Sequence, residues 1–241
     1  MIKFFRKIRY NLIEKNKTGK YFKYAIGEII LVVIGILIAL SINNLNEEKK
    51  ANLFQYKTLV ELHSSVLINI HELNAGVEMN EEAKKSCEII LNHLANNIEY
   101  QDSLDISFSK SLFWYKYVPD DSSYESVKTY GLHIIKNDSI RNLLTQVNES
   151  KVDWIQTREK RNHTFFYTTI QPLSLELFES TTDYYKMTPT NYNELKNNKK
   201  YIHILNSLVN NRIQDIVWYK ELLVEMKHLE KLIQSEINKG L

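Results

Sequence analysis

The chain has 241 residues, of which 44% are apolar and 25% are charged, and its net charge is +2. This composition is typical of a chain that folds and excludes an intrinsically disordered protein. Glycine (6 residues) and proline (3 residues) are scarce, which favours long helices, because a strand-rich fold needs both residues at its turns. We therefore expect an all-α protein. The single cysteine, Cys87, excludes a domain held together by internal disulfides.

Residues 1–24 form a basic N-terminal segment. They contain eight Lys and Arg residues and one acidic residue, Glu14, so the segment carries a charge of +7. Its apolar side chains fall on one side of a helix at Ile2, Phe5, Ile8 and Leu12. This pattern predicts an amphipathic helix that lies on an anionic membrane surface, here the cytoplasmic one. The alternative is a solvated basic tail.

Residues 25–42 read AIGEIILVVIGILIALSI, with a single charged residue and no proline. A helix of this length measures about 27 Å, close to the hydrocarbon thickness of a bilayer, which predicts a transmembrane helix. Because short basic segments stay in the cytoplasm, we expect the N-terminus inside and a helical extracytoplasmic domain at 43–241. The alternative is a signal peptide cleaved near Ala39-Leu40-Ser41, which the length of the apolar stretch disfavours.

One face of this helix carries Glu28, Gly35 and Ala39, since Gly35 and Ala39 each lie within about 20° of the Glu28 direction at 100° per residue. Gly35 and Ala39 make a small-xxx-small pair, which allows two helix backbones to approach closely. The face predicts contact between membrane helices and a homo-oligomer. The alternative is that Glu28 only reaches the membrane interface and anchors the helix there.

For 43–241 we expect an antiparallel bundle of about four to five long helices. The helix from the membrane continues to about Leu73, Gly76 marks a turn, and a second helix runs to about Asn96. Cys87 lies on the apolar stripe of that second helix, so we interpret it as a buried packing residue and not as a reactive thiol.

Residues 97–123 are the least regular part of the chain and contain an aromatic cluster. The cluster either closes one end of the bundle or forms a ligand cage. A pocket between helices is expected to involve Trp114, Tyr115, Trp154 and Arg158.

Three later signals mark helix ends. Ser122 and Glu125 have the spacing of a capping box, and Gly131 is placed for a left-handed C-terminal cap. Asn137 or Asp138 caps a further helix that runs to about Gln171, where a proline bends or breaks it. The last helix keeps a 3- and 4-residue apolar spacing from Ile202 to Ile237, broken only by Arg212 and Glu230.

Two blocks of sequence carry a resemblance to a known family. The first is the N-terminal MIKFFRKIR…TGKYFKYAIGEIILVVIGILIALSINN, and the second runs from Ser123 to Arg141. The chain resembles an uncharacterised family, a domain of unknown function, of single-span bacterial inner-membrane proteins with a helical periplasmic domain. The motif residues of the second block are Tyr124, Glu125, Lys128 and Gly131. The resemblance implies a location in the inner membrane and carries no known activity.

Signals for chemistry are few. Glu225 and His228 form one E-x-x-H pattern, but there is no second copy, so we interpret it as a surface pair and expect no metal. No phosphate loop, nucleophile elbow or nucleic-acid motif occurs, so we expect neither an enzyme, a cofactor nor a nucleic-acid partner.

The sequence favours a membrane-anchored interaction or scaffold protein. Its expected partners are membrane lipid, a second copy of the chain and another envelope protein. The alternative is a sensor that binds a ligand or a stress signal in the periplasm and signals through a membrane partner. A polar pocket in the bundle would favour the sensor, whereas a flat, exposed apolar patch would favour the interaction protein.

Overall fold

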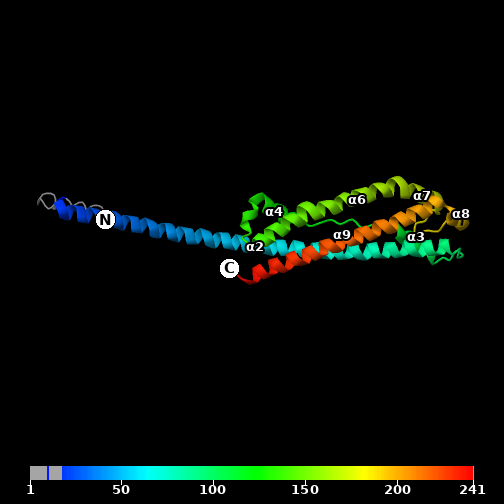
Figure 1. Ribbon diagram of the computed structural model, residues 1–241, viewed down its shortest axis with the longest axis horizontal. Coiled ribbons are helices and arrows are strands. Elements are labelled where there is room, and N and C mark those ends of the chain that lie inside the picture. Colours follow the sequence, from blue (N-terminus) through cyan, green and yellow to red (C-terminus); the bar gives the residue numbers. More distant parts are fainter. Residues whose placement is uncertain (1–9, 11–17, 241) are drawn as a thin grey trace. The chain divides into compact units, whose positions relative to one another are not determined.

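The computed structural model describes residue 10 and residues 18–240, and these residues are predominantly helical (Figure 1). The all-α prediction is confirmed, since the only β pairing within the described ranges is an isolated bridge between Phe178 and Pro189. Most of the basic segment predicted to lie on the membrane falls outside these residues. The elements are α2 (Thr18–Ala95), α3 (Leu104–Ser111), α4 (Ser122–Tyr130), η1 (Leu132–Ile134), α5 (Asp138–Gln146), η2 (Val147–Val152), α6 (Asp153–Phe165), η3 (Phe166–Ile170), α7 (Gln171–Leu177), α8 (Tyr192–Asn197) and α9 (Lys199–Asn238).

The chain divides into two compact units, residues 1–54 and residues 55–241. In the first unit, the described residues 18–54 are helical throughout. An 18-residue window of this helix has a mean hydropathy of 2.8, and none of it is buried. Six consecutive apolar residues, 29–34, are all exposed, so apolar side chains cover the whole circumference of the helix. By length and composition, this segment is able to cross a membrane.

In the second unit, α9 runs antiparallel to the later part of α2 and to α6, and the three lie side by side (Figure 1). Residue numbers on the two neighbours fall as the numbers on α9 rise, which fixes the direction. The pairs are Asn80–Arg212 and His63–Glu230 between α2 and α9, and Arg158–Asp215 and Lys151–Glu225 between α6 and α9. Arg212 and Glu230, which break the apolar stripe of α9, therefore both bind polar partners on α2.

Gly76 does not mark a turn, and that prediction was wrong, because α2 continues through it to Ala95. A Cβ atom at position 76 would lie 2.5 Å from Cε2 of Tyr219 and 2.8 Å from Cδ1 of Tyr115. Glycine is needed here so that two aromatic rings can pack against the helix backbone. Within residues 18–240 the long helical stretches are consequently α2, the run from α5 to α7, and α9.

The run from α5 to α7 begins where the sequence predicted. Asn137 is its N-cap, and its side-chain oxygen accepts hydrogen bonds from the backbone N–H groups of Ser139 (3.0 Å) and Ile140 (3.3 Å). The run contains two π-helical segments, η2 and η3. Pro172 lies in the first turn of α7, which follows η3 directly. The proline therefore coincides with the change from π-helical to α-helical hydrogen bonding, and it does not end the helix, which continues to Leu177.

The second unit has two apolar cores, one at each end of the bundle. The first core joins α2, α4, α5 and α9, and the second joins α2, α3, α7, α8 and α9. Cys87 lies in the second core with no exposed surface, and its thiol donates a long hydrogen bond of 3.8 Å to the Ser111 carbonyl. The burial of Cys87 confirms its interpretation as a packing residue, and it raises the pKa of the thiol to about 12.

Candidate functional site

The three residues of the predicted membrane-helix face all lie on α2 in the first unit. A Cβ atom added at Gly35 would have no neighbouring atom within 4 Å, so this face offers open space beside the backbone. Glu28 is partly buried and Ala39 is exposed. The helical spacing therefore places all three on one side, as expected from their positions in the sequence.

The four residues of the expected pocket are not brought together in one pocket. Tyr115 donates a 2.5 Å hydrogen bond to Glu72 on α2, and Arg158 pairs with Asp215 on α9. Trp154 packs its ring against Trp218 at a centroid distance of 5.8 Å and stays 45% exposed. Trp114 lines a separate groove, described below. Each of the four side chains therefore has a different partner.

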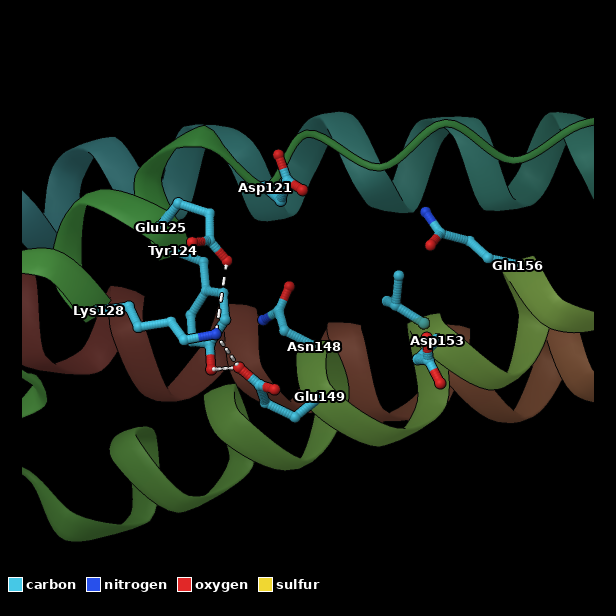
Figure 2. Close-up of a pocket in the computed structure, with 9 residues that line it drawn as sticks. Asp121, Tyr124, Glu125, Lys128, Asn148, Glu149, Asp153 and Gln156 are labelled. Carbon is cyan, nitrogen blue, oxygen red and sulfur yellow. Dashed lines mark hydrogen bonds and ion pairs between the residues drawn. The ribbon is translucent and has the colours of Figure 1, made fainter.

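An acidic hollow of about 190 Å³ lies between α4 on one side and η2 with the start of α6 on the other (Figure 2). Three of the four family-like motif residues, Tyr124, Glu125 and Lys128, project into it from α4 (Figure 2). The full lining consists of these three residues with Asp121, Asn148, Glu149, Val152, Asp153 and Gln156. Four carboxylates and one ammonium group give the hollow a negative charge.

Glu149 connects the two walls of the acidic hollow. Its Oε1 atom accepts a hydrogen bond of 2.9 Å from the Tyr124 hydroxyl and one of 2.6 Å from the Lys128 ammonium group. These bonds hold the pKa of Glu149 below its usual range, with Lys128 as the larger cause. Burial and the bond to Glu149 raise the pKa of Tyr124. The hollow is therefore closed at one end by an ion pair that is itself solvated.

The α4 wall is fixed by the chain that precedes it. Asn69 on α2 donates to the Asp120 carbonyl at 3.0 Å and accepts from the Asp120 N–H at 2.7 Å. The Asp120 carboxylate then accepts from the hydroxyls of Ser122 (2.6 Å) and Ser65 (2.9 Å), which lowers its pKa. The predicted capping box is not formed, because Ser122 is already the first residue of α4 and the residue before it makes no side-chain cap.

Gly131 ends α4, as predicted, but it does not line the hollow. Its φ angle is +104° and its ψ angle is 130°, a conformation that L side chains rarely adopt. A Cβ atom at this position would also lie 2.6 Å from Nδ1 of His133. Arg141 holds the turn that follows, since its guanidinium donates to the Ile135 carbonyl at 2.6 Å. This part of the family-like block is therefore structural.

The η2 segment, Val147–Val152, provides the lower wall of the hollow and is π-helical. In a π segment the backbone hydrogen bonds join residues five apart in place of four, which rotates the side chains that follow it, and such segments occur frequently at functional sites. The sequence did not predict that Asn148, Glu149, Asp153 and Gln156 line a hollow. The π segment changes which side of the helix the following side chains occupy, and the spacing of apolar residues does not reveal that change. The spacing of Glu149 and Asp153, four residues apart, was the one available signal.

A larger groove of about 640 Å³ lies between the extended segment 114–119 and α6. The segment contributes Trp114, Lys116, Tyr117, Val118 and Pro119, and the helix contributes Gln156, Glu159, Lys160, His163 and Thr164. Gln156 lines this groove and the acidic hollow, so the two are neighbours along α6.

Glu159 is a buried carboxyl group in the lining of the groove, 7% exposed. Its Oε1 atom accepts hydrogen bonds from the Tyr219 hydroxyl (2.5 Å) and from the Tyr117 N–H (2.8 Å). Burial raises the pKa of Glu159, although both hydrogen bonds oppose the rise. Through this one oxygen atom, Glu159 on α6 is hydrogen-bonded both to the extended segment and to α9.

The E-x-x-H pattern has no ligand geometry. Glu225 forms an ion pair of 3.3 Å with Lys151. Among residue 10 and residues 18–240, no three His, Cys, Asp or Glu side chains gather in a way that could hold a metal ion.

Comparison with known proteins identifies the family of the chain. A family model, described as a family of unknown function (DUF6090), matches residues 28–157, which is more than half of the chain. Comparisons with curated proteins and with solved structures gave no match. The matched range contains every residue that lines the acidic hollow, and it ends before most of the α6 side of the groove. The chain therefore belongs to the DUF6090 family of unknown function.

Proposed function

We propose that this protein is a membrane-anchored interaction or scaffold protein whose helical domain binds another protein of the cell envelope. One observation carries the membrane-anchored part of the proposal: apolar side chains cover the whole circumference of the helix at residues 29–34, and none is buried. In water such a surface is strongly unfavourable, whereas in hydrocarbon it is matched to its surroundings. The proposal includes no catalytic step and no cofactor.

The proposed location is the inner membrane of a bacterium, with the N-terminus in the cytoplasm and residues 43–241 in the periplasm. The support for this orientation is the charge of +7 on residues 1–24, against a charge of −4 on the residues that follow the apolar segment. Short basic segments are retained on the cytoplasmic side. Membrane lipid is then the first partner, through both the apolar helix and the basic segment.

The orientation predicts the outcome of a fusion experiment. Alkaline phosphatase fused after Leu241 should be active, because it folds only after export, and a fluorescent protein that cannot fold after export should be dark at the same position. Deleting the apolar segment 25–42 should abolish phosphatase activity while the fusion is still made. A dark phosphatase fusion together with a bright fluorescent fusion would reverse the orientation.

We further propose that the protein forms a homo-oligomer through Glu28, Gly35 and Ala39. Association of helices in lipid depends on close packing, and the open space beside Gly35 allows a second backbone to approach. A carboxyl group on the same face can hydrogen-bond across the contact.

Replacing Gly35 with isoleucine should weaken self-association of the membrane helix, because the larger side chain forces the two backbones apart. Gly27 is the matched control: it also has no atom within 4 Å of a Cβ position, but lies about 80° around the helix from Gly35. The measurement is a reporter assay of helix association in an inner membrane, normalised to expression. Equal signals for Gly35→Ile and Gly27→Ile would remove the basis of the proposed interface.

The second candidate function is a periplasmic sensor that signals through a membrane partner. The specific observation in its favour is the pair of neighbouring hollows on the second unit, of about 190 and 640 Å³. The larger volume lies in the range typical of small-molecule sites.

A further inference from the structure

The groove between segment 114–119 and α6 has an apolar wall and a charged rim. Trp114, Val118 and Pro119 supply the apolar surface, and Trp114 is held in place by the His163 ring, whose centroid lies 5.4 Å away in an edge-on arrangement. A volume of about 640 Å³ accommodates an organic molecule of one or two rings. The dimensions therefore fit a small amphiphilic molecule better than a bare ion.

Two lysines on the rim are available to a ligand. Lys116 and Lys160 are both exposed, and neither ammonium group makes a hydrogen bond or an ion pair within the described residues. In contrast, Lys128 in the acidic hollow is paired with Glu149 at 2.6 Å, and Lys151, which lines neither hollow, is paired with Glu225 at 3.3 Å. The groove thus has two exposed ammonium groups next to an apolar wall, and one of them, Lys116, lies close enough to the buried Glu159 carboxyl group to oppose the rise in its pKa.

The charge on α6 changes sign along the groove. Asp153 lies in the acidic hollow, Gln156 lines both hollows, and Lys160 lies on the rim of the groove (Figure 2 shows Asp153 and Gln156). With a rise of 1.5 Å per residue, Asp153 and Lys160 are about 10 Å apart along the helix axis. An anionic group is therefore repelled from the acidic end and attracted to the lysine end, which orients a bound molecule.

Internal hydrogen bonds hold the two walls of the groove together. Glu159 accepts hydrogen bonds from the Tyr117 N–H and from Tyr219, so the extended segment cannot move away from α6 without breaking them. Tyr117 is 1% exposed, and its hydroxyl has no partner within the described residues. A preformed site avoids the entropic cost of ordering on binding.

We propose that this groove binds a small organic anion with an aromatic or aliphatic body. The body packs against Trp114, Val118 and Pro119, and a carboxylate or sulfonate group meets Lys116 and Lys160. This proposal rests on the sensor candidate, because it names the class of ligand that such a sensor would bind. It does not depend on the proposed contact between membrane helices.

The test uses the full chain in phosphatidylcholine nanodiscs and three probes with the same body: 3-phenylpropanoate, 3-phenylpropan-1-ol and 3-phenylpropylammonium. Binding is measured by titration calorimetry and by the fluorescence of Trp114 in a Trp154→Phe/Trp218→Phe background. The propanoate should bind tightest, with a dissociation constant of about 1 mM, and the ammonium probe weakest.

Two double variants distinguish binding in the groove from non-specific attraction of the anion to the protein's positive charge. Lys116→Gln/Lys160→Gln should weaken the propanoate about five- to tenfold and leave the alcohol unchanged, because each exposed charge contributes modestly. Lys227→Gln/Lys231→Gln removes the same charge from exposed positions of α9 outside the groove and should change nothing.

Three outcomes would overturn the inference: no binding of the propanoate at about 10 mM, equal binding of all three probes, or equal loss in the two double variants. The topology fusions and the Gly35→Ile assay do not depend on these results. A negative result in the groove experiments alone would overturn the proposed ligand. A reversed result in the fusion experiment would overturn the orientation, and a negative Gly35→Ile assay would overturn the membrane-helix interface.

Discussion

Replacing Asp215 with alanine is expected to lower the free energy of unfolding by about 3–5 kcal/mol, the usual cost of removing one partner of a buried ion pair. Asp215 on α9 accepts hydrogen bonds from Arg158 (2.9 Å) and from Asn162 (2.9 Å), and the side chains of the ion pair are only 10% and 12% exposed. Without the carboxylate, the Arg158 guanidinium stays buried and unpaired. The measurement is urea unfolding of the full chain in detergent micelles, followed by far-UV circular dichroism.

The matched control is Glu81→Ala, which breaks the exposed pair between Lys220 and Glu81 (side chains 56% and 49% exposed) and should cost less than about 1 kcal/mol. The double variant Arg158→Met/Asp215→Leu should recover much of the lost stability, since apolar side chains of similar volume replace buried pairs well. A cost for Asp215→Ala no larger than that for Glu81→Ala would show that the α6–α9 contact does not depend on this pair.

Replacing Gly76 with alanine is expected to destabilise the bundle by about 2 kcal/mol, although alanine is the better helix former by about 1 kcal/mol. The new Cβ would meet the Tyr219 ring at 2.5 Å and the Tyr115 ring at 2.8 Å. Neither ring moves freely, because the two hydroxyls donate 2.5 Å hydrogen bonds to Glu159 and Glu72. The expected fall in the unfolding midpoint is about 4–8 °C, measured by thermal unfolding.

Glu78→Ala is the control for this substitution, since position 78 is exposed on the same helix and the change there should shift stability by less than about 0.5 kcal/mol. Gly76→Val should be worse than Gly76→Ala, because the branched side chain adds volume at the same contact. A midpoint raised by Gly76→Ala would mean that helix propensity outweighs packing at this site.

Local signals in the sequence were sufficient for several features. The apolar run at 25–42 predicted a helix able to cross a membrane, and the apolar stripe predicted a buried Cys87. The sequence narrowed the cap of α5 to Asn137 or Asp138, and Asn137 is the N-cap. Each of these depends on residues within one or two helical turns, so the sequence alone determines them.

Other features depend on residues that are distant in the chain. Glycine is common in turns, which is why Gly76 was predicted to mark one. The residue is instead needed because the Tyr219 ring, on another helix, packs against the backbone at this position. Trp154 and Arg158 are one turn apart and were expected to share a pocket, yet Arg158 is engaged by Asp215, 57 residues later. The polar breaks at Arg212 and Glu230 likewise find their partners on α2.

The sequence by itself determined that this chain is helical, that one segment has the length and composition to cross a membrane, and where several helices begin and end. Only the tertiary structure decided that α2 passes Gly76, that α4 and η2 enclose the acidic hollow, and that segment 114–119 forms a groove with α6. The physical reason is range: periodicity and capping act over a few residues, whereas hollows and buried pairs arise where helices distant in the sequence meet.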